Sequence, residues 1–195
     1  MGEGHWAKVQ DAARGGRNLA SALEIWVCRH GQTEDNSTKT AAGWNAGGLS
    51  AMGIEQAKQL GERLRSESFD SMHVSDLHRT EMTAELVNAA RKEPSEWIKD
   101  SRLREKGAGA NEGKSIGTSE RQAKQQGVST RTFRPAGGGE SWEDVATRAR
   151  SFIRGVVRTA DTSPLKHRRI LVVTHGGWIK ALHLLPPAQL YATRP

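Results

Sequence analysis

Two short apolar segments, each followed by a histidine and a glycine, constrain this chain more than any other feature of its sequence. The first, Glu24–Cys28, runs into Arg29-His30-Gly31. The second, Ile170–Thr174, runs into His175-Gly176-Gly177. Short apolar runs bounded by polar residues and glycine are typical of strands buried in a parallel sheet. We therefore expect two central strands, each with a histidine directly beyond its carboxyl end.

Stretches with helical spacing separate these strands. Ser50 is a predicted N-cap, and the apolar residues after it recur on one helical face. Residues 77–90 show the same spacing. Ser141, with Asp144 three positions later, forms a predicted capping box before another amphipathic stretch. The sequence therefore predicts three amphipathic helices that pack their apolar faces on a sheet.

Shorter apolar runs predict two further strands, Ser71–Val74 and Trp97–Lys99. Residues 101–140 are polar and glycine-rich, with a weak helical pattern only near 117–126. Strands that alternate with helices favour the α/β class, here a three-layer α/β/α sandwich with a mostly parallel central sheet. Because ligands of such sheets bind beyond the carboxyl ends of the strands, His30 and His175 mark the predicted site.

The length of 195 residues is enough for one domain. Residues 1–23 lack periodicity and a secretory signal, so we expect a flexible N-terminal extension before a domain that spans 24–195. No apolar run reaches the length of a membrane span. The single cysteine, Cys28, has no internal disulfide partner, which is typical of a reducing compartment. We therefore expect a cytoplasmic protein without membrane association.

The basic excess of the chain is confined to its C-terminal part. Lys and Arg number 29 against 22 Asp and Glu, a net charge of +7, yet residues 146–195 alone carry +8 from nine basic residues and one acidic residue. Arg150, Arg154 and Arg158 recur every four residues and predict one solvated helix face. The six tryptophans are scattered, and no nucleic-acid-binding motif is present. We therefore predict no nucleic-acid partner.

The residues around the two histidines suit phosphoryl transfer. One histidine can attack phosphorus while a second histidine and arginines bind the equatorial oxygens. Arg79 follows a predicted strand near a helix start, where it is either an anion ligand or an ordinary solvated residue. Glu105 lies in a polar segment, where it is either a proton donor or part of a charged loop. The histidines have no metal-ligand spacing, so we predict no metal site.

Six ordered motifs between residues 24 and 184 resemble the histidine phosphatase superfamily, also called phosphoglycerate mutase-like. They are Arg29-His30-Gly31 with Thr33 and Asn36, Leu49-Ser50 with Gly53 and Gln56-Ala57, Ser75-Asp76-Leu77 with Arg79-Thr80, Leu103 with Glu105, Gly138-Gly139-Glu140-Ser141, and Thr174-His175-Gly176-Gly177. Six matches in this order are far more specific than any one of them. The resemblance implies the phosphoglycerate mutase-like form of the three-layer sandwich.

The resemblance also implies a role for each matching residue. The catalytic residues would be His30 as the phosphorylated nucleophile, Glu105 as the proton donor, and His175. The groups that would hold the phosphoryl oxygens are those of Arg29, Arg79 and His175, supported by Asn36 and the Gly176 backbone. No metal and no cofactor are implied. The expected activity is hydrolysis of a small phosphomonoester through a phosphohistidine intermediate.

Two features look most like the TIGAR-like fructose-2,6-bisphosphatases within that family. They are Leu103-Arg104-Glu105-Lys106 with Gly109 and Glu112-Gly113-Lys114, and the glycine-rich Pro135–Ser141. This implies a small phosphorylated sugar, such as fructose-2,6-bisphosphate, as the substrate. Two alternatives stay open, namely phosphoglycerate mutase-type phosphotransfer and a catalytically inactive interaction protein of the same fold. The short chain, with little sequence to build a closing lid, favours hydrolysis over the mutase reaction.

Three places depart from the family pattern. Asp35 stands where the family often has an aromatic residue. Gly47 and Gly48 replace an acidic-proline stretch, which predicts a looser loop before Ser50. Family members usually continue through a further strand or helix after the second histidine, whereas this chain stops at Pro195. We therefore expect a domain shortened at its C-terminus, with an exposed sheet edge.

Overall fold

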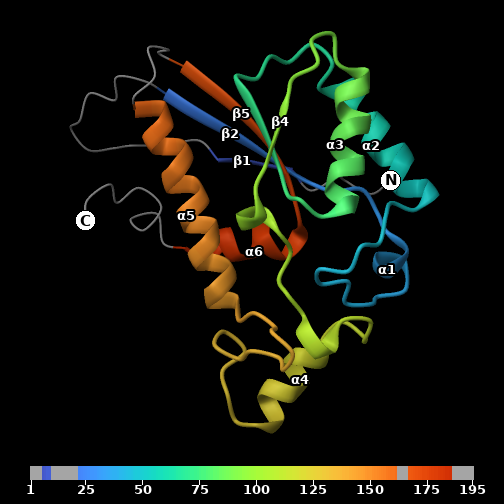
Figure 1. Cartoon of the computed structure of the whole chain (residues 1–195), viewed down its shortest axis with the longest axis vertical. Coiled ribbons are helices and arrows are strands. Elements are labelled where there is room, and N and C mark those ends of the chain that lie inside the picture. The colour runs from blue at the N-terminus through green and yellow to red at the C-terminus, as the bar shows by residue number, and fades with distance from the viewer. Residues whose placement is uncertain (1–5, 10–21, 162–166, 186–195) are drawn as a thin grey trace.

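The computed structural model describes residues 6–9, 22–161 and 167–185 (Figure 1). The strands are β1 (Trp6–Val9), β2 (Ala22–Arg29), β3 (Ser71–Val74), β4 (Trp97–Lys99) and β5 (His167–Thr174). The helices are α1 (Glu34–Ser37), α2 (Ala51–Arg63), α3 (His78–Ala90), α4 (Thr118–Gln125), α5 (Trp142–Asp161) and α6 (Gly176–His183), with two 3-10 turns, η1 (Ser101–Leu103) and η2 (Gly109–Asn111). Strands alternate with helices, so the predicted α/β class is confirmed.

The five strands form one sheet in the order β1-β2-β5-β3-β4. Strands β2, β5, β3 and β4 run parallel, whereas β1 pairs with β2 antiparallel. The register sets Arg29 of β2 opposite Thr174 of β5, and Val74 of β3 opposite Val173 of β5. The three central strands therefore end at the same edge of the sheet, where they are followed by His30, Ser75 and His175.

Helices cover both faces of this sheet (Figure 1), because successive side chains of a strand point to opposite sides. Ile170 and Val172 of β5 belong to a core that includes Phe152 of α5 and Trp178 of α6. Leu171 of β5 belongs to a second core on the other side, under α2 and α3. Two apolar cores separated by one sheet make the architecture the predicted three-layer sandwich with a mostly parallel sheet.

Two predicted helix starts are confirmed. The Ser50 hydroxyl accepts a hydrogen bond from Gly53 N at the start of α2. Ser141 Oγ accepts one from Asp144 N, and the Asp144 carboxylate accepts one from Ser141 N, which completes the capping box before α5. Arg134 donates two hydrogen bonds to the same carboxylate and thereby holds the pKa of Asp144 well below its usual value. These hydrogen bonds fix the start of helix α5 at Trp142, directly after Ser141.

The N-terminal part differs from the sequence-based prediction in one respect. Residues 1–23 show no periodicity, yet Trp6–Val9 form strand β1, which pairs with the edge of β2. Pairing at a sheet edge is a tertiary contact, so a strand of four residues carries little local signal. The rest of the predicted extension and the chain after residue 185 lie outside the described residues. The boundary at residue 23 and the shortened C-terminus therefore stay predictions.

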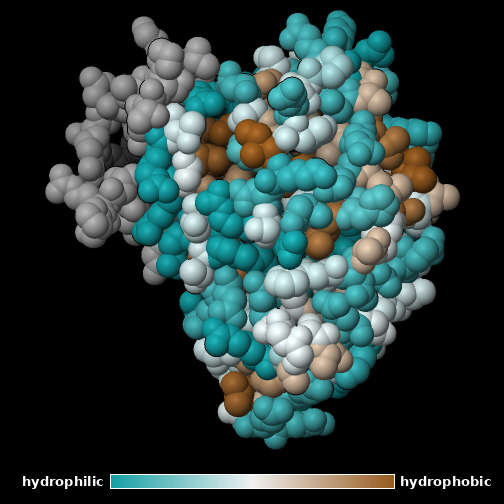
Figure 2. Space-filling view, viewed as in Figure 1, coloured by the Kyte–Doolittle hydropathy of each residue, from teal (hydrophilic) through white to brown (hydrophobic). Residues whose placement is uncertain are grey.

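Between β4 and α5 the chain makes a long excursion away from the sheet. It carries η1, which lies beside α5 and α6, and then η2 and α4, which form the lower part of the molecule in Figure 1. Figure 2 shows that the surface of this part is mostly hydrophilic, in keeping with its polar composition. The weak helix predicted near 117–126 is confirmed as α4. None of the helices in the described ranges is both long and apolar enough to cross a membrane.

Candidate active site

The two predicted histidines lie side by side beyond the carboxyl ends of β2 and β5. Their ring centroids are 5.0 Å apart, and the ring planes make an angle of 61°. His30 N donates to Thr174 O at 3.0 Å, which continues the parallel ladder one step past the strands. His30 is 6% exposed and His175 is fully buried. The register of the sheet therefore brings together two residues that are far apart in the chain.

A backbone carbonyl sets the tautomer of His30. Its Nδ1 lies 2.7 Å from Gly31 O. Because a carbonyl can only accept, Nδ1 carries the proton and Nε2 keeps its lone pair. The pKa of His30 is lowered to about 3, chiefly by burial and further by the charges of Arg79 and Arg29. The imidazole is thus neutral near pH 7 and has a nucleophilic nitrogen.

His175 is held from the other side by the end of strand β3. Ser75 follows β3, and its hydroxyl lies 2.9 Å from His175 Nε2. The other ring nitrogen, Nδ1, is buried and has no hydrogen-bond partner among the described residues. Burial, together with the charges of His30 and Arg79, keeps the pKa of His175 well below its usual value. The sequence motif that contains Ser75 gives this residue no role, and only the strand order β2-β5-β3 identifies its contact.

Arg79 is buried, which excludes the interpretation of a solvated residue in the first turn of α3. It is 2% exposed. Its guanidinium donates to two carbonyls of the loop before α2, at 2.8 Å to Gly43 O and 3.1 Å to Asn45 O. Burial lowers the pKa of Arg79, and the carboxylate of Glu105 opposes that shift. The helix start therefore holds a fixed positive charge within electrostatic reach of the histidine pair.

Arg29 directly precedes His30, and Gly176 directly follows His175. The Arg29 side chain is exposed, and a β-carbon on Gly176 would lie 3.4 Å from Arg29 Nε. Arg29 therefore runs past the start of α6, which begins at Gly176. The first N–H groups of a helix lack intrahelical partners and attract anions. This part of the site thus combines an exposed cation with backbone donors.

Glu105 lies against the first turn of α6. Its Oε2 accepts a hydrogen bond from Gly177 N at 3.1 Å, and its Oε1 accepts one from Lys106 N at 2.8 Å. A β-carbon on Gly177 would overlap Glu105 Oε1, so this contact requires glycine. Because Gly177 is two residues past His175, the carboxyl group lies at the same strand edge as the histidines.

Asn36, another predicted site residue, makes hydrogen bonds within its own turn. Its Oδ1 accepts a hydrogen bond from Thr33 N at 3.2 Å, and its backbone N donates to Thr33 Oγ1 at 3.2 Å. These bonds form a capping box around the single turn α1. The structure therefore gives the side-chain oxygen of Asn36 a partner within its own turn, and a phosphate-supporting role for this residue stays a prediction.

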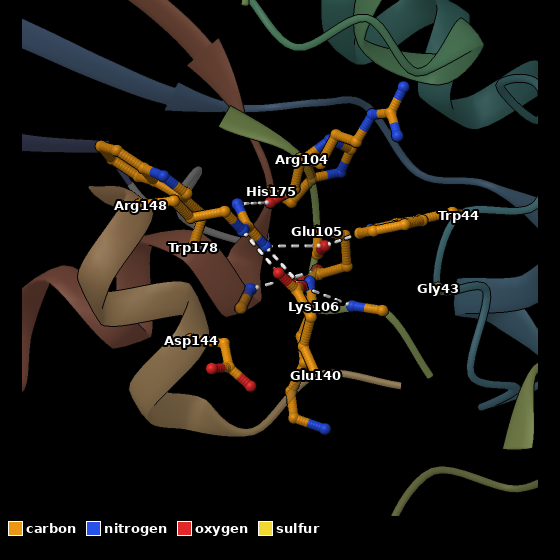
Figure 3. Close-up of polar contacts among 12 residues, drawn as sticks. Gly43, Trp44, Arg104, Glu105, Lys106, Glu140, Asp144, Arg148, His175 and Trp178 are labelled. Carbon is orange, nitrogen blue, oxygen red and sulfur yellow. Dashed lines mark hydrogen bonds and ion pairs between the residues drawn. The ribbon is translucent and has the colours of Figure 1, made fainter. Parts of the chain in front are cut away.

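A polar network holds the segment that carries Glu105 (Figure 3). Arg148 of α5 forms an ion pair with Glu140 at 2.9 Å and donates to Glu105 O at 2.9 Å. Trp44 Nε1 donates to the same carbonyl at 2.8 Å, and the Arg104 guanidinium lies over the Trp44 ring. The sequence alone gives no role to Arg148 or Trp44, because nothing in their local pattern distinguishes them from ordinary helix and loop residues.

The arrangement has the parts of a phosphoryl-transfer site. It offers a neutral nucleophilic imidazole, two arginine charges, backbone donors and a carboxyl group at one strand edge. Positioning and fixed positive charge supply most of the catalysis in such reactions. In the part of the chain that the structure describes, no three His, Cys, Asp or Glu side chains are placed to hold a metal ion.

Comparison with known proteins agrees with this geometry. The model of the histidine phosphatase superfamily (branch 1) matches residues 25–186. A probable phosphoglycerate mutase GpmB of Proteus mirabilis is 33% identical over 157 residues, which cover 79% of this chain and 70% of the relative. The broad-specificity phosphatase YOR283W of Saccharomyces cerevisiae is 33% identical over 166 residues, covering 82% and 68%. Fructose-2,6-bisphosphatase TIGAR B of Danio rerio is 35% identical over 135 residues, covering 68% and 52%.

Solved structures give the same result for the fold. Phosphoglycerate mutase from Bacillus anthracis superposes with a TM-score of 0.73 at 28% identity, over 85% of this chain and 81% of that one. The mycobacterial glucosyl-3-phosphoglycerate phosphatase Rv2419c superposes with a TM-score of 0.68 at 30% identity, over 84% and 81%. The predicted phosphoglycerate mutase-like fold is therefore confirmed.

Proposed function

This chain belongs to the histidine phosphatase superfamily, and from that premise we propose that it hydrolyses small phosphomonoesters through a phosphohistidine at His30. One observation carries the proposal. His30 is neutral, has a defined tautomer and lies against His175, with the charges of Arg79 and Arg29 acting on both rings. A phosphate dianion is complementary in charge to this arrangement.

In the first step His30 Nε2 attacks phosphorus opposite the leaving oxygen. The N–P bond forms, the P–O bond to the leaving group breaks, and Glu105 gives its proton to the leaving oxygen. Arg29, Arg79 and His175, through its Nδ1, hold the equatorial oxygens and stabilise their charge. The hydrogen bond from His30 Nδ1 to Gly31 O stabilises the positive charge that develops on the ring.

In the second step water replaces the alcohol. The Glu105 carboxylate takes a proton from water as the water oxygen attacks phosphorus, and the N–P bond breaks. Inorganic phosphate leaves, His30 is again neutral, and Glu105 again carries a proton. The same carboxyl group thus serves as acid in the first step and as base in the second, so the catalytic groups return to their starting state.

We propose a small phosphorylated sugar as the substrate class, with fructose-2,6-bisphosphate as the specific candidate. The support is the likeness to TIGAR B, a fructose-2,6-bisphosphatase by name, and to a glucosyl-3-phosphoglycerate phosphatase. The free, buried Cys28 suits a proposed location in the reducing cytoplasm. Burial raises the pKa of the Cys28 thiol to about 12, so this neighbour of the site is unreactive.

Chemical trapping of the phosphoenzyme tests the proposal. The purified chain is mixed with ³²P-labelled substrate, quenched and mapped for base-stable, acid-labile phosphate. We expect label on His30, and His30→Ala should lose the label and reduce turnover by about 10⁴-fold or more. The matched control is His183→Ala, because His183 is an exposed histidine at the end of α6. Label on another residue, or full activity of His30→Ala, would overturn the assignment.

A substrate panel separates the remaining alternatives. Phosphate release is measured with fructose-2,6-bisphosphate, 2,3-bisphosphoglycerate, 3-phosphoglycerate and a phosphopeptide. Conversion of 3-phosphoglycerate to 2-phosphoglycerate without release would indicate the mutase reaction. A chain that gives no release and no rise in melting temperature with vanadate would indicate an inactive member of the fold.

A further inference from the structure

Side chains rather than a backbone ladder hold the segment that carries Glu105. Four consecutive carbonyls, from Arg102 to Glu105, each accept a hydrogen bond from a side chain elsewhere in the fold. Thr174 Oγ1 donates to Leu103 O at 2.7 Å, and Trp178 Nε1 donates to Arg102 O at 2.9 Å. Arg148 donates to the carbonyls of Arg102, Arg104 and Glu105 at 2.5 to 2.9 Å.

Arg148 uses every donor that it has in this network (Figure 3). Its Nε and Nη2 bind the two carboxylate oxygens of Glu140, both at 2.9 Å. Its remaining N–H groups bind the three carbonyls, so all five guanidinium donors have acceptors. Arg148 therefore has no donor left for a phosphate oxygen and is not itself a phosphate ligand.

Glu140 binds both the Arg148 side chain and the backbone of Gly107. Its carboxylate holds the Arg148 guanidinium and also accepts a hydrogen bond from Gly107 N at 2.9 Å. Its own backbone N donates to Gly107 O at 2.9 Å. The side chains of Arg148 and Glu140 are each only 15% exposed, so this charge pair lies largely out of water, where its geometry is strongly constrained.

We propose that Arg148, held by Glu140, is the positioning residue for Glu105, an inference that rests on the proposed role of Glu105 as the proton donor. Helix α5 packs into the apolar core through Val145, Ala149 and Phe152, so it provides a rigid base for Arg148. Three hydrogen bonds from one planar group set the backbone on which the Glu105 carboxyl depends. A carboxyl displaced by about 1 Å loses much of its catalytic effect.

Leaving-group dependence tests this proposal, because a general acid matters for an alkoxide and much less for an acidic phenol. We compare kcat/KM for glycerol 2-phosphate and for 4-nitrophenyl phosphate. In Arg148→Lys, which keeps the charge and loses the planar fork, we expect kcat/KM to fall by about 10- to 100-fold for the alkyl ester. For the aryl ester we expect a fall of less than about threefold. Glu105→Gln should show the same asymmetry with a larger loss.

The matched control is Arg134→Lys. Arg134 forms the same kind of two-pronged pair with Asp144 near the start of α5, on an exposed side chain. We expect both esters to react as in the wild type. If Arg148→Lys melts below the assay temperature, the same two esters are compared in Glu140→Gln. This variant removes the charge that holds Arg148 and keeps the shape of the side chain.

Equal losses for both esters in a folded Arg148→Lys or Glu140→Gln variant would show a general structural role and overturn the proposal. The His30 labelling experiment keeps this outcome separate from a failure of the proposed function. Wild-type chain without label on His30 would refute the mechanism itself. Label on His30 with equal losses would refute only the positioning role of Arg148.

Discussion

The histidine end of the sheet and the Glu105 segment meet at one site but are held by different means. His30, His175 and Ser75 each follow a strand, and the ladder of β2, β5 and β3 sets their spacing. Glu105 follows the 3-10 turn η1, and its segment is held by side chains that come from α5, β5, α6 and the loop before α2. One half of the site is therefore built by backbone pairing and the other by tertiary polar contacts.

The two halves of the site should respond differently to side-chain substitutions. Backbone ladder bonds survive most side-chain substitutions, so the distance between the histidines is robust. The Glu105 segment depends on a few individual side chains. One substitution in α5 can therefore displace the Glu105 carboxyl group without moving His30. Phosphate binding and proton donation should thus be separable by mutation.

Among the variants that test this difference between the two halves, the largest effect is expected from removing a charge at the histidine end. Arg79→Ala should lower kcat/KM by about 10²–10³-fold and weaken vanadate binding, because the buried cation that we propose to bind the phosphoryl oxygens is lost. Steady-state kinetics and vanadate titration measure both quantities. Arg65→Ala is the control, since Arg65 is exposed and forms an ion pair with Glu62 at the end of α2. An Arg79→Ala variant within about threefold of wild type would remove Arg79 from the site.

A smaller effect, confined to proton donation, is expected from Gly177→Ala. The new methyl group would displace the Glu105 carboxyl from its hydrogen bond to Gly177 N. We expect kcat/KM for an alkyl ester to fall by about tenfold or more, with vanadate affinity unchanged. Gly155→Ala in α5 is the control, because its β-carbon would make only an ordinary contact, 3.5 Å from Arg102. Weakened vanadate binding in Gly177→Ala would contradict the separation of the two halves.

The last expected effect is on stability rather than on rate, and it depends on the pH. The pKa values of His30 and His175 lie below 6.5, chiefly because of burial, so below pH 6.5 the unfolded chain binds protons that the native site does not. The free energy of unfolding should therefore fall as the pH drops from 6.5 towards 3, by at most about 1.4 kcal/mol per pH unit for each histidine.

Thermal melting between pH 7 and pH 4 checks this dependence. His30→Asn should melt with a shallower pH dependence than the wild type, because one of the two buried imidazoles is gone. His183→Ala, which changes an exposed histidine, should keep the wild-type slope. Identical slopes for the wild type and His30→Asn would show that His30 is not held neutral by its burial.

Much of the fold was predictable because its signals are local. The apolar runs before His30 and His175 indicated β2 and β5, and the caps at Ser50 and Ser141 placed the starts of α2 and α5. Strand β1 was missed because its four residues become a strand only by pairing with β2. Arg79 was ambiguous because a buried and a solvated arginine have the same sequence pattern at a helix start.

The sequence by itself determined which residues stand at the strand ends, and hence that His30 and His175 share an edge of the sheet. Its motifs also indicated the superfamily. Only the tertiary structure decided the tautomer of His30, the burial of Arg79 and the network from Glu140 through Arg148 to Glu105. The physical reason is the separation in sequence of the interacting residues. Strands and caps follow from neighbours along the chain, whereas burial and side-chain hydrogen bonds depend on residues that only folding brings together.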